Sequence, residues 1–159
     1  IFPPKLEVEW DDSSWNTGSL SALSATDLDR LKVYFQNLKP EYKEKSKVKF
    51  RVVGRELYPT RGFDTTPAAL TVKYLPSGSR TLQQGAYYSV KDAETEDVII
   101  PFSTGSIISC DSTSNYFNLW MDGFQPERFY RFEIKVVSGS GAEQTSMIYD
   151  DDFTFKVVR

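Results

Sequence analysis

Alternating apolar and polar positions are the dominant pattern of this chain. Val48, Phe50 and Val52 alternate with lysine and arginine, and residues 130–136 place an aromatic or aliphatic side chain at every second position. A period of two sends successive side chains to opposite faces of a strand, so both segments predict strands with one buried face. Similar or continuous apolar patterns occur at residues 31–35, 70–74, 98–100, 117–121 and 153–157. We expect about eight strands in total.

Residues that favour turns separate these segments and include Pro40, residues 59–62, 76–79, 122–123 and 138–141. Proline and glycine at such spacing break or reverse strands, which predicts an all-β, antiparallel sandwich. Pro101 lacks a backbone donor, so it is expected to end the strand at residues 98–100 or to place it at a sheet edge. Residues 24–29 predict a turn or a short helix at most.

The first part of the chain differs from the rest. Leu6, Val8 and Trp10 alternate with glutamate and predict a single strand that must pair outside itself. A polar stretch around Trp15 follows, which is typical of a connector. We predict that residues 1–26 end a preceding domain or form an extended assembly arm, and that residues 27–159 form the sandwich. The residues predicted to bind a partner are Leu6, Val8, Trp10, Trp15 and Leu20.

A short motif precedes the strongest predicted strand. Phe124, Pro126 and Tyr130 have the spacing of a tyrosine corner, in which a tyrosine hydroxyl bonds to the backbone a few residues upstream. In this respect residues 30–159 resemble fibronectin type III and immunoglobulin-like domains. The resemblance implies an antiparallel β-sandwich. The lone Cys110 departs from the immunoglobulin pattern that carries a disulfide.

Composition narrows the chemistry that this chain can perform. The chain has 159 residues, no histidine and one cysteine, and its length suffices to bury a core without metals or disulfides. The lack of histidine removes Ser-His and Cys-His nucleophile pairs and histidine-ligated zinc. No apolar run approaches the roughly 20 residues that span a bilayer. Cys110 is expected to be a buried apolar residue.

Three groups of carboxylates could in principle hold a cation. They lie at residues 11–12, 92–97 and 150–152, and none has the ligand spacing and turn glycine of a calcium loop. Solvated loop tips are the favoured interpretation, because neighbouring like charges repel and stay in water. We therefore expect no metal ion, no cofactor and no enzymatic activity.

Five basic residues share one parity and are predicted to form a basic face on one strand: Lys43, Lys45, Lys47, Lys49 and Arg51. A solvated sheet face is the favoured interpretation, since lysine on outer strands also blocks unwanted edge pairing. A docking surface for an acidic partner and a nucleic-acid site are the alternatives, the latter because phosphate contacts need clustered cations.

Aromatic residues leave a further alternative open. Trp10, Trp15, Trp120, Tyr87 and Tyr88 could stack against sugars, as aromatic side chains do in carbohydrate-binding sandwiches. Most of these side chains are expected in the core. Trp15, in its polar connector, is the better candidate for an interface anchor.

Several local strings are similar to the C-terminal part of virion structural proteins of T4-like tailed bacteriophages, the kind common in marine cyanophages. The strings lie at residues 10–15, 17–20, 55–61, 87–93, 109–112, 126–131 and 155–159. The resemblance implies a non-catalytic module of a multi-copy particle that is assembled in a bacterial cytoplasm and binds other virion proteins. It assigns no functional residue.

We therefore expect a structural and interaction module of a tailed-phage virion, with the tail, baseplate or neck favoured over the head. The alternative is a carbohydrate-binding adhesion module on a phage or cell surface.

Overall fold

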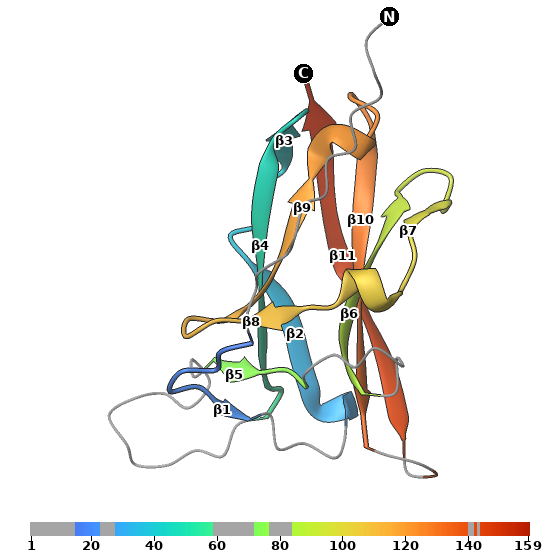
Figure 1. Cartoon of the computed structure of the whole chain (residues 1–159). Coiled ribbons are helices and arrows are strands. Elements are labelled where there is room, and N and C mark those ends of the chain that lie inside the picture. The colour runs from blue at the N-terminus through green and yellow to red at the C-terminus, as the bar shows by residue number, and fades with distance from the viewer. Residues whose placement is uncertain (1–14, 23–27, 59–71, 77–83, 140–141, 143) are drawn as a thin grey trace, which may run out of the picture.

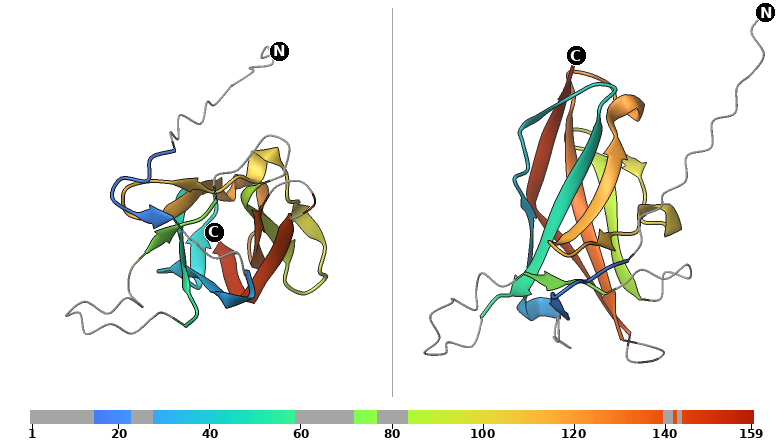
Figure 2. Two further views of the ribbon diagram at one scale, coloured as in Figure 1. Left: turned by 90° about the horizontal axis from the view of Figure 1, so that it is seen from below. Right: turned by 60° about the vertical axis from the view of Figure 1, so that its left-hand side comes forward.

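A computed structural model describes residues 15–22, 28–58, 72–76, 84–139, 142 and 144–159. Two β-sheets pack face to face, so the fold is an all-β sandwich, as predicted (Figure 1; Figure 2). The strands are β1 (Ser21–Ala22), β2 (Leu31–Gln36), β3 (Glu41–Lys43), β4 (Lys47–Glu56), β5 (Lys73–Tyr74), β6 (Gly85–Asp92), β7 (Val98–Ile100), β8 (Ser109–Cys110), β9 (Asn115–Trp120), β10 (Phe129–Ser138) and β11 (Thr145–Val158). Single turns of 3-10 helix are η1 (Leu28–Arg30), η3 (Thr104–Ser106) and η4 (Met121–Gly123).

The two sheets have a defined strand order. In sheet A the strand order is β1-β5-β4-β9-β8. β2 also belongs to sheet A and pairs with the edge of β4 that faces away from β9. In sheet B the strand order is β3-β11-β10-β6-β7. The run β2-β4-β9-β8 facing β11-β10-β6 corresponds to the ABED and GFC sheets of immunoglobulin sandwiches. Two short pairs, β1 with β5 and β3 with β11, are parallel. The sheets are therefore mixed, and their long strand pairs are antiparallel, as predicted.

The inward positions of the alternating strands form an aromatic core. Phe50 of β4 lies 4.8 Å from Phe132 of β10 between ring centroids, and Phe132 stacks on Phe155 of β11 at 4.6 Å. All three side chains are at most 3% exposed. The alternation in residues 48–52 and 130–136 thus identified the buried faces of both sheets.

Tyr130 joins the crossover between the sheets at the start of β10. Its hydroxyl donates to the Gln125 carbonyl at 3.0 Å and accepts from the Gln125 amide at 2.8 Å. The Phe124 ring packs edge-on against Tyr130, with 4.8 Å between ring centroids. Pro126, which lies between these two residues in the sequence, is half-buried. This is the hydrogen bonding that defines a tyrosine corner.

The described part of the N-terminal segment is attached to sheet A. β1 pairs with β5 through Ser21 and Lys73, and the Asn16 amide donates to the Cys110 carbonyl at 3.0 Å. The Trp15 ring lies edge-on to Tyr74 at 6.3 Å. Residues 15–22 therefore contribute to the sandwich, although the sequence placed them in the connector.

Residues 150–152 lie within a strand, so the prediction of a loop tip was wrong there. Phe132 pairs with Phe153, but Ile134 pairs with Tyr149, so the three aspartates bulge opposite one residue of β10. Asp152 has a φ of 56°, a left-handed conformation that aspartate tolerates better than most residues. The bulge lies near β2, where Asp151 forms an ion pair with Lys32.

Candidate interaction surfaces

The five basic residues do not lie on one strand, and the prediction of a single basic face was wrong in this respect. Lys43 ends β3 in sheet B, and Lys45 lies in a turn with a φ of 62°. The Ser46 amide and hydroxyl both donate to the Lys43 carbonyl, at 3.3 and 2.6 Å, and this turn carries the chain into sheet A. Only Lys47, Lys49 and Arg51 share one face of β4.

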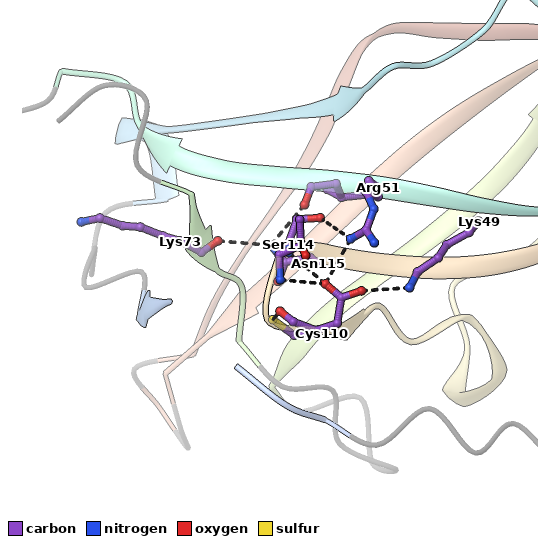
Figure 3. A network of polar contacts seen from close by, with 9 residues as sticks. Lys49, Arg51, Lys73, Cys110, Ser114 and Asn115 are labelled. Atoms are coloured by element: carbon purple, nitrogen blue, oxygen red, sulfur yellow. Dashed lines mark hydrogen bonds and ion pairs between the residues drawn. The ribbon is translucent and has the colours of Figure 1, made fainter. Parts of the chain in front are cut away.

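Two of these cations bind a carboxylate in the turn between β8 and β9 (Figure 3). Lys49 Nζ lies 2.8 Å from one oxygen of Asp111, and Arg51 Nη1 lies 3.0 Å from the other. Burial disfavours the charged form, but hydrogen bonds from Arg51, Lys49 and the amides of Ser114 and Thr113 outweigh it. Together they hold the pKa of Asp111 well below its usual range.

Further contacts give this cluster, the Asp111 cluster of Lys49, Arg51, Asp111 and Ser114, a structural role. Arg51 Nη1 also donates to Ser114 Oγ at 2.9 Å, and Lys49 Nζ lies 3.8 Å from the centre of the Tyr116 ring. The two cations thus fasten the turn before β9 to the neighbouring strand β4. Their charge is engaged by Asp111, which favours a structural role over phosphate binding for this part of the basic set.

One exposed tryptophan lies beside Lys47, the remaining member of the basic set on β4. Trp120 is 47% exposed and pairs in register with Lys47, whose Nζ lies 5.1 Å from the ring centre. Asn118 is half-buried two residues earlier on β9. A broad ring next to a cation and an amide can stack against a sugar or against a protein side chain.

The wider aromatic platform considered from the sequence does not assemble among the described residues. Tyr87 and Tyr88 are 1% and 7% exposed, and Tyr88 stacks on Phe117 in the core at 4.0 Å. Trp15 is half-buried, with its ring edge-on to Tyr74. Trp10 lies outside the described residues.

Of the predicted partner-binding residues, Trp15 and Leu20 lie among the residues that the structure describes. Leu20 is half-buried, and its amide donates to the Thr17 carbonyl at 2.9 Å in a turn that follows Trp15. Leu6 and Val8, like Trp10, lie outside the described residues. Their role therefore stays a prediction.

The rim of sheet B carries an apolar surface that the sequence analysis did not select as a site. Val98 and Ile99 of β7 are 53% and 43% exposed. β7 is the last strand of its sheet, and within the described ranges no strand pairs with its outer edge (Figure 1). It ends at Ile100, directly before Pro101, as predicted. The signal available in the sequence was an apolar run next to a strand-ending proline.

The turn that leads into β7 is acidic and firmly held. The carboxylate of Asp92 accepts from the amides of Glu94 and Thr95 at 2.9 and 3.1 Å and from Arg128 Nη1 at 2.7 Å. These bonds, the two amides foremost, lower the pKa of Asp92. The exposed carboxylates of this turn belong to Glu94, Glu96 and Asp97. Glu96 forms an ion pair with Arg131 at 2.6 Å, and Asp97 accepts a hydrogen bond from the Thr95 hydroxyl at 2.8 Å.

The segment after β7 has the opposite electrostatic character. The sequence contains no acidic residue from 98 to 110. Ser103 caps η3 through a capping box with Ser106. Lys135 of β10 extends toward this segment, and its Nζ lies 5.9 Å from the centre of the Phe102 ring. Acidic and basic ends therefore flank the exposed strand.

The single cysteine is buried in this structure. Cys110 is fully buried, as predicted, and burial together with the nearby Asp111 charge raises the pKa of its thiol to about 11. Within the described ranges, no group of three or more Cys, Asp or Glu side chains could hold a metal ion. The described residues also contain no helix long and apolar enough to cross a membrane.

Comparisons with known proteins do not place the chain in a family. No protein-family model, no curated protein and no solved structure matches it. The function is therefore argued from the surfaces described above.

Proposed function

We propose that this chain is a non-enzymatic structural and interaction module that binds neighbouring proteins in a multi-copy assembly. The exposed, apolar edge strand β7 is the observation that carries this proposal. A free strand edge offers a row of backbone donors and acceptors to another chain, and exposed Val98 and Ile99 add apolar area. Residues 6–20 are the proposed second contact with a partner.

The shifted pKa values support a structural role for the polar groups concerned. Asp92 and Asp111 each hold a turn through backbone amides and a cation. The Tyr149 hydroxyl donates to the Leu28 carbonyl at 2.7 Å, and burial raises its pKa to about 12. These groups are engaged in fastening one element to the next, which is what a rigid scaffold requires.

The assembly that we propose is the virion of a tailed phage, in the tail, baseplate or neck rather than the head. The support for this finer proposal is the sequence resemblance at residues 10–15, 55–61 and 126–131. The proposed partners are other virion proteins. A sandwich whose single cysteine cannot form an internal disulfide suits assembly in a bacterial cytoplasm.

The experiment that tests this proposal is quantitative mass spectrometry of virus particles purified from the biological source of the chain. We expect the chain in a fixed ratio to the major tail proteins, retained after the particles are washed at high salt. Absence from washed particles, or a ratio that varies between preparations, would contradict the proposal.

A carbohydrate-binding module is the second candidate, and exposed Trp120 with Lys47 beside it favours it. A bound sugar would change the fluorescence of Trp120 and produce signals on a glycan array. Both effects should disappear in Trp120→Ala and persist in Phe129→Ala, which removes a comparably exposed ring from sheet B. Silence of the wild-type chain in both assays rejects this candidate.

A further inference from the structure

We propose that β7 pairs in antiparallel orientation with β7 of a second copy of this chain, so that sheet B continues across a symmetric dimer. The inference deepens the proposed interaction role and rests on it. It names the partner of the exposed edge as another copy of the chain.

The outer edge of β7 is open to a further strand. Val98 and Ile99 are both exposed, and neither they nor Ile100 carries a charge. Natural edge strands are usually blocked by lysine, proline or a bulge. Two of these features are present, since the register shifts where β7 pairs with Val90 and Lys91 and Pro101 ends the strand, but Val98 and Ile99 remain apolar and exposed.

The distribution of charge along this segment selects the orientation. Glu94, Glu96 and Asp97 precede β7, with Glu96 paired to Arg131 at 2.6 Å, whereas the residues after β7 are uncharged and Phe102 among them lies beside Lys135. Parallel pairing of two copies would place carboxylates against carboxylates, which is destabilising. Antiparallel pairing instead places the acidic end of one copy beside the basic end of the other.

A two-fold axis at Ile99 makes these contacts occur twice. In that register Val98 opposes Ile100 of the partner subunit, and Asp97 opposes Pro101 of the partner subunit. Adjacent strands lie about 4.8 Å apart, so Asp97 comes beside Pro101 of the partner subunit and its neighbour Phe102. Lys135 is on β10, two strands in from β7, and its Nζ reaches to 5.9 Å from the Phe102 ring centre, so it approaches Asp97 of the other copy along the Phe102 side chain. A surface that carries both complementary ends is self-complementary, as an isologous interface must be.

The expected dimer is weak. A three-residue strand and its flanking turns bury less than the roughly 1,200 Å² of a standard interface, so we expect a dissociation constant of roughly 10⁻⁴ M. In a multi-copy particle, where neighbouring copies are held together, the effective concentration exceeds this value. The contact would therefore form on assembly and only partly in dilute solution.

The first arm of the test is sedimentation equilibrium of the full chain over a wide concentration range. Wild type should show a monomer–dimer equilibrium, and Ile99→Lys should weaken it at least tenfold by placing a charge on the paired edge. Ile148→Lys is the matched control, since Ile148 is 49% exposed on β11 of the same sheet and should leave the dimer unchanged. Thermal unfolding of each variant checks that it is folded.

The second arm exchanges the two charges. Asp97→Lys and Lys135→Glu should each remain monomeric, because each opposes like charges across the dimer. An equimolar mixture of the two variants should regain wild-type association, since both contacts of the mixed dimer then join opposite charges. Two folded single variants that fail to associate when mixed would overturn the charge-matched register.

A monomeric wild-type chain, or equal association of wild type and Ile99→Lys, would overturn the dimer itself. Neither result would contradict the proposed function, because the presence of the chain in purified particles is measured in a separate experiment. Conversely, a dimer without incorporation into particles would contradict the virion assignment and leave the β7 interface in place.

Discussion

The side-chain carbonyl of Asn115 accepts a hydrogen bond from the Leu75 amide at 2.9 Å. This bond lies where the strand paired with β4 changes from β9 to β5. β9 pairs with β4 as far as Val52, and β5 takes over at Gly54. The Asn115 amide nitrogen donates to the carbonyls of Val52 and Lys73, both at 3.2 Å. One fully buried side chain thus replaces the ladder bonds that neither strand supplies there.

Replacement of this side chain should be costly. Asn115→Ala leaves three buried backbone groups without their partner, and we expect the free energy of unfolding to fall by about 3 kcal/mol. Urea denaturation measures the loss, and hydrogen exchange should show reduced protection of the Leu75 amide. Asn118→Ala, at a half-buried position of the same strand, should change stability by less than about 0.5 kcal/mol. Equal effects of both substitutions would contradict the role of Asn115.

The ion pairs of the Asp111 cluster should make the free energy of unfolding depend on pH. The pKa of Asp111 is lowered in the folded protein, so ionised Asp111 stabilises the fold above its unfolded pKa of about 4. This contribution is lost as the pH falls toward the folded pKa. Because the site is partly exposed, we expect Asp111→Asn to cost about 1 kcal/mol at pH 7. The difference from wild type in urea denaturation should shrink below about pH 4. A pH-independent difference would contradict this ion-pair account.

Alternation identifies a strand only when one of its faces meets water. It located β2, β4 and β10, but it did not predict β6. Residues 85–90 of β6 are all buried, so no polar face alternates with an apolar one. The outward Tyr87 is covered where it forms a bridge with Ile107, and the Ile108 amide donates to the Ala86 carbonyl. A segment about twenty residues later in the chain therefore hides the signal.

The basic set shows a similar limit. Shared parity implies a shared face only within one continuous strand, and the turn at Ser46 divides the set between two sheets. The carboxylate that binds Lys49 lies 62 residues away, and no local pattern indicates it. By contrast, the tyrosine-corner motif is local, because Tyr130 bonds only five residues upstream, and its spacing could be recognised in the sequence.

The Cys110 thiol should be unreactive in the folded chain. It is fully buried and its pKa is raised to about 11, so little reactive thiolate is present near pH 8. We expect iodoacetamide to modify Cys110 slowly in the native protein and rapidly in urea, as mass spectrometry of the intact chain would show. Rapid native modification would mean that the thiol is accessible and would contradict its buried position.

Removal of one oxygen tests the corner at the start of β10. Tyr130→Phe keeps the ring contacts with Phe124 and Phe155 and removes both hydrogen bonds to Gln125. Because the Gln125 amide and carbonyl lose a partly buried partner, we expect stability to fall by about 1–2 kcal/mol. Burial, opposed by the Gln125 bond, raises the pKa of Tyr130, so the effect should be the same at pH 6 and pH 8. The measurement is urea denaturation beside Tyr58→Phe, whose ring is 80% exposed and which should match wild type. Equal stability of both variants would show that the hydroxyl does not hold the crossover.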